Sequence, residues 1–271
     1  MNWLAARIIG VSVWGPALEG WAASQPVLSG NADYVPVESP APPPAILPPN
    51  ERRRIGPVAR LALAVAAEAT AMSGLPPSGL RSVFASGNGD GVVLGNILTD
   101  LTRPGDPARL VSPTQFHNSV HNAVAGYWSI ATASQQPLTS LACHDFTFAA
   151  GLLTAMAEVA TQAEPVLLCV YDHPMPAPLD AKRHLVASFG VGLVLVPADG
   201  AGGGLGRIEV RFVPEAASAD AGAPCQPALR ALARGNPAAQ SLRLLESLAR
   251  RAADRHVLAY LDGRLDVAVA R

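Results

Sequence analysis

The sequence has little charge, few cysteines and no long apolar run, and each shortage excludes a class of protein. Of its 271 residues 15% are charged and the net charge is −1, whereas a general nucleic-acid binder is strongly basic. The three cysteines are scattered, so they indicate neither a disulfide framework nor a Cys-x-x-Cys zinc pattern. No stretch approaches the roughly 18 apolar residues that cross a bilayer. We therefore expect a cytoplasmic protein that binds no nucleic acid and spans no membrane.

Apolar residues are abundant instead. Hydrophobic residues make up 49% of the chain, which is enough for a sizeable core. Ordinary soluble domains carry about a quarter charged residues, so this chain has an unusually uncharged surface. Such a surface favours an exterior that is partly covered by a partner.

Strand and helix patterns alternate along the chain, which predicts an α/β protein with helices packed on a sheet. The predicted strands are 7–14, 82–87, 165–172, a hairpin of 187–197 with 207–214, and a second hairpin around Asp262-Gly263. The predicted helices include Pro57 to Gly74, a helix through Leu94 and Leu101, and one that begins after Asn236-Pro237. We expect residues 1–214 to form one domain, 215–227 a linker, and 228–271 a helix and hairpin that pack on the same domain.

The stretch from Val111 to Met156 organises the sequence. The apolar strand Pro137 to Ala142 leads into Cys143, and a helix is predicted from about Asp145. A cysteine ahead of a helix N-terminus is favoured as a thiolate, because the helix dipole stabilises negative charge. With His144 as base, Cys143 is a candidate nucleophile. The alternative is a packed structural cysteine, because free cysteine is commonly buried.

A metal site is a weaker interpretation of the same stretch. His117 and His121 are four residues apart, so on one helix they would share a face and could bind zinc with Cys143 or His144. However, Asn118 or Ser119 is expected to cap that helix, which leaves His117 outside it. We therefore expect no metal and no cofactor.

Three other motifs have two interpretations each. Arg52-Arg53-Arg54 could receive an acidic partner, or could be a solvated entry to the helix at Pro57. The glycines at 87, 89 and 91 match neither phosphate-loop spacing and predict a tight turn. Asp172-His173 at a strand end is a candidate acid–base pair without a third group.

The order of these motifs resembles the N-terminal half of the β-ketoacyl synthases. The resemblance covers about residues 1–214. It rests on GVSVWGP, RRRIGPVARLALAVAAEATAMSGL, FASGNGDG, SPTQFHNSVHNAVAGYWSIAT, SLACHDFTFAAG and FGVGLVLVP. The FHNSVHNAVAGYWSIAT stretch is similar to chain-length-factor-type proteins of aryl polyene and related pigment clusters. The resemblance implies a thiolase-like fold: half of a ketosynthase, a mixed five-stranded sheet with helices packed on it, and a C-terminal half truncated to a helix and β-hairpin.

The resemblance also implies roles for individual residues. Cys143 falls where a condensing enzyme accepts an acyl chain, although Leu141-Ala142-Cys143 replaces the usual Thr-Ala-Cys. Asp145 is expected to raise the pKa of a neighbouring thiol. The family's two catalytic histidines and a lysine belong to a second half. The roughly 57 residues after Pro214 contain one histidine, His256. We therefore expect a non-catalytic or impaired subunit.

Such a subunit is expected to pair with a full-length ketosynthase and to act with acyl carrier protein. The strand Pro137 to Ala142 would pair antiparallel across the dimer axis, flanked by a helix from Asn118 to Thr132. The implied interface residues are Asn118, His121, Asn122, Pro137, Leu138, Thr139, Ser140, Leu141 and Ala142. Phe116, Trp128, Phe146 and Phe148 are candidates for bulk in an acyl tunnel, and Arg52, Arg53 and Arg54 for contact with the carrier protein.

Two alternatives remain. One is a stand-alone acyltransferase or thioesterase that uses Cys143. The other is a non-catalytic, homodimeric carrier-protein-binding module.

Overall fold

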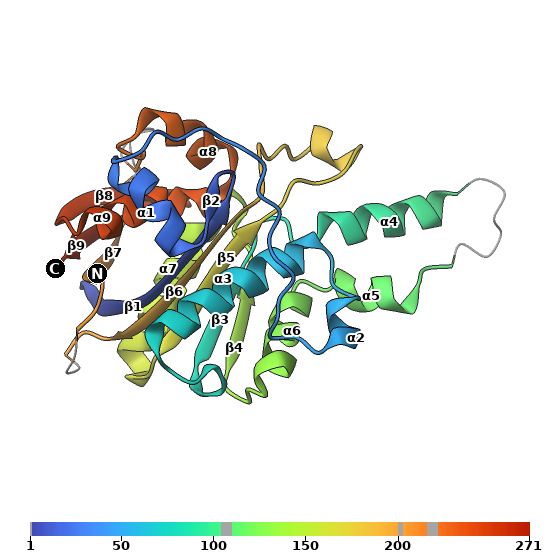
Figure 1. Cartoon of the computed structure of the whole chain (residues 1–271), viewed down its shortest axis with the longest axis horizontal. Helices are drawn as coiled ribbons and strands as arrows, with labels where there is room; N and C mark the ends of the chain where they lie inside the picture. The colour runs from blue at the N-terminus through green and yellow to red at the C-terminus, as the bar shows by residue number, and fades with distance from the viewer. Residues whose placement is uncertain (1, 104–109, 200–202, 216–221) are drawn as a thin grey trace.

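The computed structural model describes residues 2–103, 110–199, 203–215 and 222–271. Within these residues nine strands form one mixed sheet, with helices on both of its faces (Figure 1). The strands are β1 (Leu4–Gly15), β2 (Leu18–Glu19), β3 (Arg81–Ala85), β4 (Leu138–Leu141), β5 (Val166–Asp172), β6 (Phe189–Pro197), β7 (Gly206–Val213), β8 (Asp254–Tyr260) and β9 (Gly263–Ala270). Their order is β4-β3-β5-β6-β1-β7-β9-β8, and β2 pairs with β1.

The α-helices are α1 (Trp21–Ser29), α2 (Pro49–Arg52), α3 (Pro57–Ser73), α4 (Gly91–Thr102), α5 (Pro113–Ser119), α6 (Ala123–Thr132), α7 (Thr147–Gln162), α8 (Arg230–Gly235) and α9 (Leu242–Arg250). Short 3₁₀ turns η1 (Pro77–Gly79), η2 (His144–Phe146), η3 (Leu179–Ala181), η4 (Pro227–Leu229) and η5 (Pro237–Ser241) connect them. The predicted α/β class is confirmed. The sheet has nine strands and not the predicted five, because β7 pairs with β1 and the terminal hairpin β8–β9 continues the same sheet from β7.

The strand β1 lies inside the sheet and separates two strands that the sequence predicted to be neighbours. It pairs antiparallel with β6 over Ala6–Trp14 and antiparallel with β7 over Leu4–Ile8. The predicted hairpin of β6 with β7 is therefore wrong. Both strands were correctly located, but β1 is longer than its apolar core and lies between them. It forms the main-chain hydrogen bonds that β6 and β7 were expected to make with each other.

The two faces of the sheet carry separate cores. On one face α3 and α6 cover Phe84, Cys169 and Val194. On the other face α7, α1 and α9 cover Val83, Val170 and Leu193. The β5 sequence VLLCVYD is buried along its whole length, as a strand covered on both faces must be.

The C-terminal residues extend the same sheet. The strand β9 pairs with β7 from Arg207 to Val213, and β8 pairs with β9 through the predicted turn at Asp262-Gly263. Asn236 caps η5 by accepting a hydrogen bond from the Ala238 N–H. Residues 216–221 of the predicted linker lie outside the described residues.

The single helix predicted over Asn118 to Thr132 is two helices. Ser112 and Gln115 form a capping box that starts α5 earlier than expected, and α6 begins only at Ala123. The turn between them places Asn118 at the end of α5 and His121 outside both helices. Figure 1 shows α4 and α5 extending together away from the sheet. We call them the α4–α5 arm; along the chain they lie between β3 and α6.

None of the helices in the described ranges is both long and apolar enough to cross a membrane.

Glycines in β1 and β6 let α3 approach the sheet closely. A Cβ at Gly10 would meet the carbonyl oxygen of Ala69, and one at Gly192 would meet that of Val65. Both partners are helix backbone, which cannot rotate away as a side chain can. Ser12 of β1 donates a hydrogen bond of 2.5 Å to Glu68 of α3.

We expect Gly192→Ala to lower the free energy of unfolding by about 1–3 kcal/mol, because the helix must move off the sheet. Gly126→Ala is the matched control. Its Cβ would have no neighbour within 4 Å, and alanine favours a helix, so stability should be unchanged or slightly higher. Urea denaturation of both variants makes the comparison. Equal stabilities would contradict a close packing of α3 on β6.

Candidate functional site

Cys143 lies at a sharp turn between the edge strand β4 and the helical segment that becomes α7. Its backbone N–H donates to Thr147 Oγ1 (3.1 Å), and the same hydroxyl donates to the His144 carbonyl (2.7 Å). His144 has a left-handed backbone with φ of 51°. Residues other than glycine adopt that conformation uncommonly, although histidine does so more often than most, and here the Thr147 hydroxyl holds the turn. The strand-to-helix turn that the sequence predicts at Cys143 is therefore present, and residues 143–147 are called the elbow.

The environment of the Cys143 thiol disfavours its thiolate form. The side chain is half-buried, and desolvation raises the pKa of the thiol above its usual range. The turn η2 separates Cys143 from α7, which begins four residues later. The sequence indicated thiolate stabilisation by the helix N-terminus. The structure gives the opposite direction, and desolvation by burial is the cause.

His144 lies against Asp145, and Asp145 also pairs with Arg183, which is distant along the chain. His144 Nδ1 lies 3.1 Å from Asp145 Oδ2, and both side chains are more than half exposed. Arg183 Nη1 donates to Asp145 Oδ1 over 2.6 Å. Asp145 was expected to raise the pKa of Cys143, but desolvation is the cause of that rise. The carboxylate is instead paired with Arg183, which no local sequence signal indicates.

Asp172, at the end of β5, is the most perturbed carboxyl group near the elbow. It is fully buried, and this burial raises its pKa to about 7. Its Oδ1 accepts hydrogen bonds from Ser86 Oγ and from the Asn88 N–H, both 3.0 Å. Oδ2 is buried without a hydrogen-bond partner among the described residues. Protonation of the carboxyl group reduces the cost of burying it.

A chain of hydrogen bonds joins Asp172 to the elbow. The turn held by Asp172 carries Asn88, whose Oδ1 accepts from Arg183 Nε over 3.1 Å. Arg183 then reaches Asp145. The glycine-rich turn at 87–91 therefore acts as a structural turn, as predicted, and Asp90 caps α4 through the Val93 N–H.

The residues predicted for a dimer interface surround the open edge of the sheet. The strand β4 pairs on one side with β3, and no described strand pairs with its other side. The Ser82 and Ser86 N–H groups donate to the carbonyls of Pro137 and Leu141. Since main-chain groups alternate along a strand, those of Leu138 and Ser140 point to the open side.

The polar residues of this predicted interface anchor the α4–α5 arm to the body. Asn118 Oδ1 accepts from Tyr127 Oη (2.8 Å), and its amide donates to the Arg54 carbonyl. His121 Nε2 lies 2.9 Å from the Ser86 carbonyl, while Asn122 precedes α6 and is exposed. His117 is on α5 and His121 is not, so the two do not share a helical face. The described residues contain no group of three or more His, Cys, Asp or Glu arranged to hold a metal.

The four candidate tunnel aromatics are not gathered in this chain. Trp128 and Phe148 are fully buried in the cores on opposite faces of the sheet. Phe116 is 68% exposed on α5, and Phe146 is half-buried in η2. Only Phe116 and Phe146 therefore have surface that another molecule can contact.

The arginine run is split between structural and exposed positions. Arg52 donates to the carbonyls of Ala45 and Leu47, which fixes the proline-rich loop. Arg54 pairs with Glu51 over 3.2 Å and remains largely exposed, as does Arg53.

The unassigned pair Asp172-His173 divides between two environments. His173 Nδ1 lies 2.7 Å from Ser188 Oγ, whereas the Asp172 carboxylate accepts a hydrogen bond from Ser86 Oγ. Sequence reasoning missed Ser188, which is fifteen residues away and becomes a neighbour only because β5 and β6 pair antiparallel.

We expect Asp172→Asn to change how stability depends on pH. The folded pKa of Asp172 is about 7 against 3.8 as its ordinary value, so between those pH values the folded state holds a proton that the unfolded state releases. The contribution of Asp172 to stability therefore falls as pH rises through this window. Asparagine does not titrate, so it removes that loss. Between pH 5 and pH 8 the free energy of unfolding of the variant should rise by about 2–3 kcal/mol relative to that of wild type. Urea denaturation at both pH values measures it.

Asp199→Asn, at an exposed position, is the control and should show no such gain. A parallel pH profile for Asp172→Asn and wild type would contradict the raised pKa.

Comparisons with known proteins place this geometry in a family. A chain of the complex described as a ketosynthase (ApeO) with its chain length factor (ApeC) from Xenorhabdus doucetiae has a TM-score of 0.70 and 19% identity, covering 98% of this chain and 99% of that one. A chain of the ishigamide ketosynthase/chain length factor has a TM-score of 0.69 and 16% identity, with 98% of each chain covered.

A chain of the type II polyketide synthase complex AntDE:AntF, described as an acyl-carrier protein with its ketosynthase, has a TM-score of 0.71 and 11% identity, with 99% of each chain covered. At such identities the likeness is one of fold. No curated protein sequence matches the chain.

The sequence match is more specific. Residues 23–252 match the family described as "Beta-ketoacyl synthase, N-terminal domain". The match continues past residue 214, where the resemblance was expected to end, and so includes η5 and α9. The chain therefore belongs to the β-ketoacyl synthase N-terminal domain family, with a thiolase-like fold.

Proposed function

We propose that this chain is a chain-length-factor-like subunit that pairs with a full-length β-ketoacyl-acyl carrier protein synthase. The pair would elongate a polyketide, polyene or fatty-acid-type chain held on acyl carrier protein. The observation that carries the proposal is the open, uncharged β4 edge directly before an elbow whose thiol is not activated. Two similar structures are described as ketosynthase/chain length factor pairs, and a third as a carrier protein with its ketosynthase.

The two edges of the sheet differ in their suitability for strand pairing. The outer strand β8 carries Asp254 and Arg255, and charged side chains discourage edge-to-edge pairing. The sequence of β4, LTSL, has no charge, and its four residues are half-buried. A second uncharged strand can therefore add to β4 without burying an unpaired charge.

The arm beside this edge presents apolar side chains that the chain itself leaves uncovered. The exposed large apolar residues of the α4–α5 arm and the turn after it are Leu94, Leu98, Leu101, Leu110, Phe116 and Val120. Those on α4 recur at helical spacing and form one stripe. Ile130 on α6, exposed to 61%, adds to the apolar surface of this region. Exposed large apolar side chains in this number are typical of a protein interface.

The elbow supports a structural role in preference to catalysis. A condensing cysteine must be a thiolate, and the pKa of Cys143 is raised. His144 faces Asp145, and the rest of the network serves to position the turn. We propose that the ketosynthase partner supplies the nucleophile.

The exposure of the candidate aromatic and arginine side chains indicates which of them can contact the acyl tunnel and the carrier protein. Phe116 and Phe146 would add bulk to the partner's acyl tunnel, while Trp128 and Phe148 would support it from within. Arg53 and Arg54 would contact the carrier protein, and Arg52 would hold the loop beneath them. We further propose a cytoplasmic location and a single structural unit in which residues 228–271 pack on residues 1–214.

We expect Ser140→Pro to abolish pairing with the ketosynthase. Proline removes the one main-chain N–H of Ser140, which points to the open side, and leaves the bonds of Pro137 and Leu141 to β3 intact. Co-expression with the ketosynthase from the same gene cluster, followed by affinity capture and size exclusion, measures the complex.

Ser140→Ala keeps the backbone and should retain the pair. If wild type does not retain the ketosynthase and product synthesis survives deletion of this chain, the proposal fails. A homodimer of the isolated chain that binds carrier protein without a ketosynthase would favour the binding-module alternative.

Cys143→Ala should retain both the complex and product formation, because the thiol is not the nucleophile. Intact-mass analysis of wild type after incubation with an acyl-carrier substrate should show no acyl adduct on Cys143. An adduct together with loss of activity in Cys143→Ala would instead support the stand-alone thiol acyltransferase or thioesterase.

A further inference from the structure

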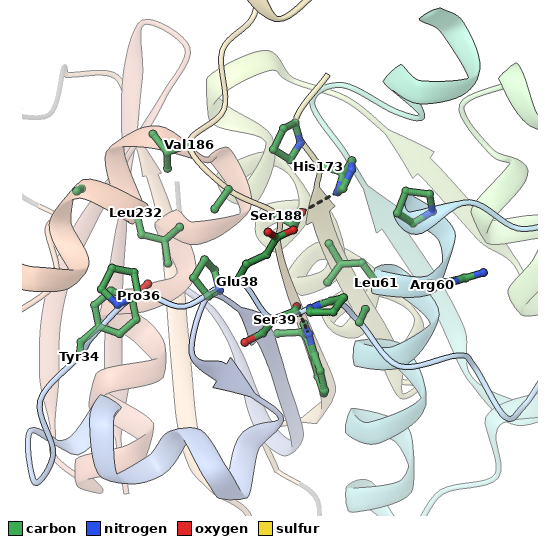
Figure 2. Close-up of a pocket in the computed structure, with 18 of the residues that line it drawn as sticks. Tyr34, Pro36, Glu38, Ser39, Arg60, Leu61, His173, Val186, Ser188 and Leu232 are labelled. Carbon is green, nitrogen blue, oxygen red and sulfur yellow. Dashed lines mark hydrogen bonds between the residues drawn. The ribbon is translucent and has the colours of Figure 1, made fainter. Parts of the chain in front are cut away.

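A cavity opens at the ends of β1, β5 and β6, well away from the β4 edge. Its volume is about 760 Å³, within the range of small-molecule sites, and it lies between the start of α3 and α8 (Figure 2). Its apolar wall includes Trp14, Leu61 and Leu232. None of its lining residues belongs to β4, α5, α6 or η2, so the cavity is separate from the elbow and from the proposed interface.

The apolar wall is held in one shape. Trp14 Nε1 donates to the Ser39 carbonyl over 2.8 Å, which fixes the plane of the indole. Ser39 Oγ donates to Glu19 Oε1 (2.8 Å) and accepts from the Ala17 N–H, so the proline-rich loop is tied to the turn between β1 and β2. Proline side chains add rigid surface around the cavity. A fixed indole beside rigid walls suits a flat apolar ligand.

One side of the cavity is polar and rich in acceptors. Figure 2 shows the Ser188–His173 hydrogen bond, with the Glu38 side chain extending toward that pair. Burial lowers the pKa of His173, and the Glu38 carboxylate interacts with it electrostatically. Asp90, the other carboxylate that acts on His173, is engaged in capping α4. The Arg60 side chain extends away from the pair. The polar side therefore presents a carboxylate beside a neutral imidazole.

We infer that this cavity is a binding site for a flat apolar molecule whose polar end donates hydrogen bonds, such as a phenol or an arylamine. A ligand ending in a carboxylate would place a negative charge against Glu38 and is disfavoured. The inference does not depend on pairing with a ketosynthase, so the two proposals fail independently.

Two probes with the same ring system test the inference on the full chain. We expect 2-naphthol to bind about tenfold more tightly than 2-naphthoate in calorimetric titrations at pH 7. Glu38→Gln should narrow that difference by improving the binding of 2-naphthoate.

A filling variant locates the site. Ala231 is an exposed lining residue of α8, so Ala231→Trp should occupy the cavity without disturbing the core and weaken 2-naphthol binding at least about tenfold. Ala160→Trp, at an exposed position of α7 outside the cavity, should leave binding unchanged. Val186→Trp, whose parent side chain is 52% exposed, is a second filling variant should the first fail to fold.

Absence of 2-naphthol binding to the folded wild-type chain would overturn the inference. Unchanged binding in the folded filling variants would overturn the location. Equal affinity for the two probes would overturn the role of Glu38 and with it the ligand class.

Discussion

The pairing of β1 with strands on both of its sides is the constraint on which the rest of the structure depends. This strand of twelve residues joins β6 to β7, and through β7 it brings the C-terminal hairpin into the same sheet. A register shift between Ile8 and Gly10 moves the in–out alternation of the β1 side chains by one residue. Ala6, Ile8, Val11 and Val13 consequently all face the core that contains α7. The same shift directs Gly10 and Ser12 toward α3, where the helix backbone approaches most closely.

The elbow is a tightly held turn from strand to helix, and its electrostatics disfavour a thiolate at Cys143. The left-handed backbone at His144 and the bonds made by Thr147 hold Cys143 at the turn. Burial, however, raises the pKa of the thiol, and the adjacent carboxylate is paired with Arg183. A turn can be preserved for the position of the strand before it, and here that strand is the open edge. Strand pairing needs only main-chain groups and shape, so it does not require a reactive thiol at Cys143.

A network of hydrogen bonds connects the elbow, which follows β4, to the end of β5. Asp172 holds the turn after β3, that turn carries Asn88, and Arg183 bridges Asn88 to Asp145. Directly beside Asp172, His173 faces the separate cavity with Ser188. Two adjacent residues at the end of β5 therefore serve different sites, because side chains alternate across a strand and its continuation.

Much of this protein followed from the sequence by itself. Periodicity located α3, α7, β5 and the terminal hairpin, since each buries a regular face that local spacing records. The apolar pattern also located β4 and placed Cys143 at the turn between this strand and the following helix. Tertiary structure alone decided how β6, β1 and β7 pair, because no local pattern encodes a strand inserted from the N-terminus between two later strands. It also decided the state of the thiol and the partners of Asp145, Asp172 and His173. Those depend on burial and on contacts across 15 to 86 residues of chain, which spacing along the sequence does not carry.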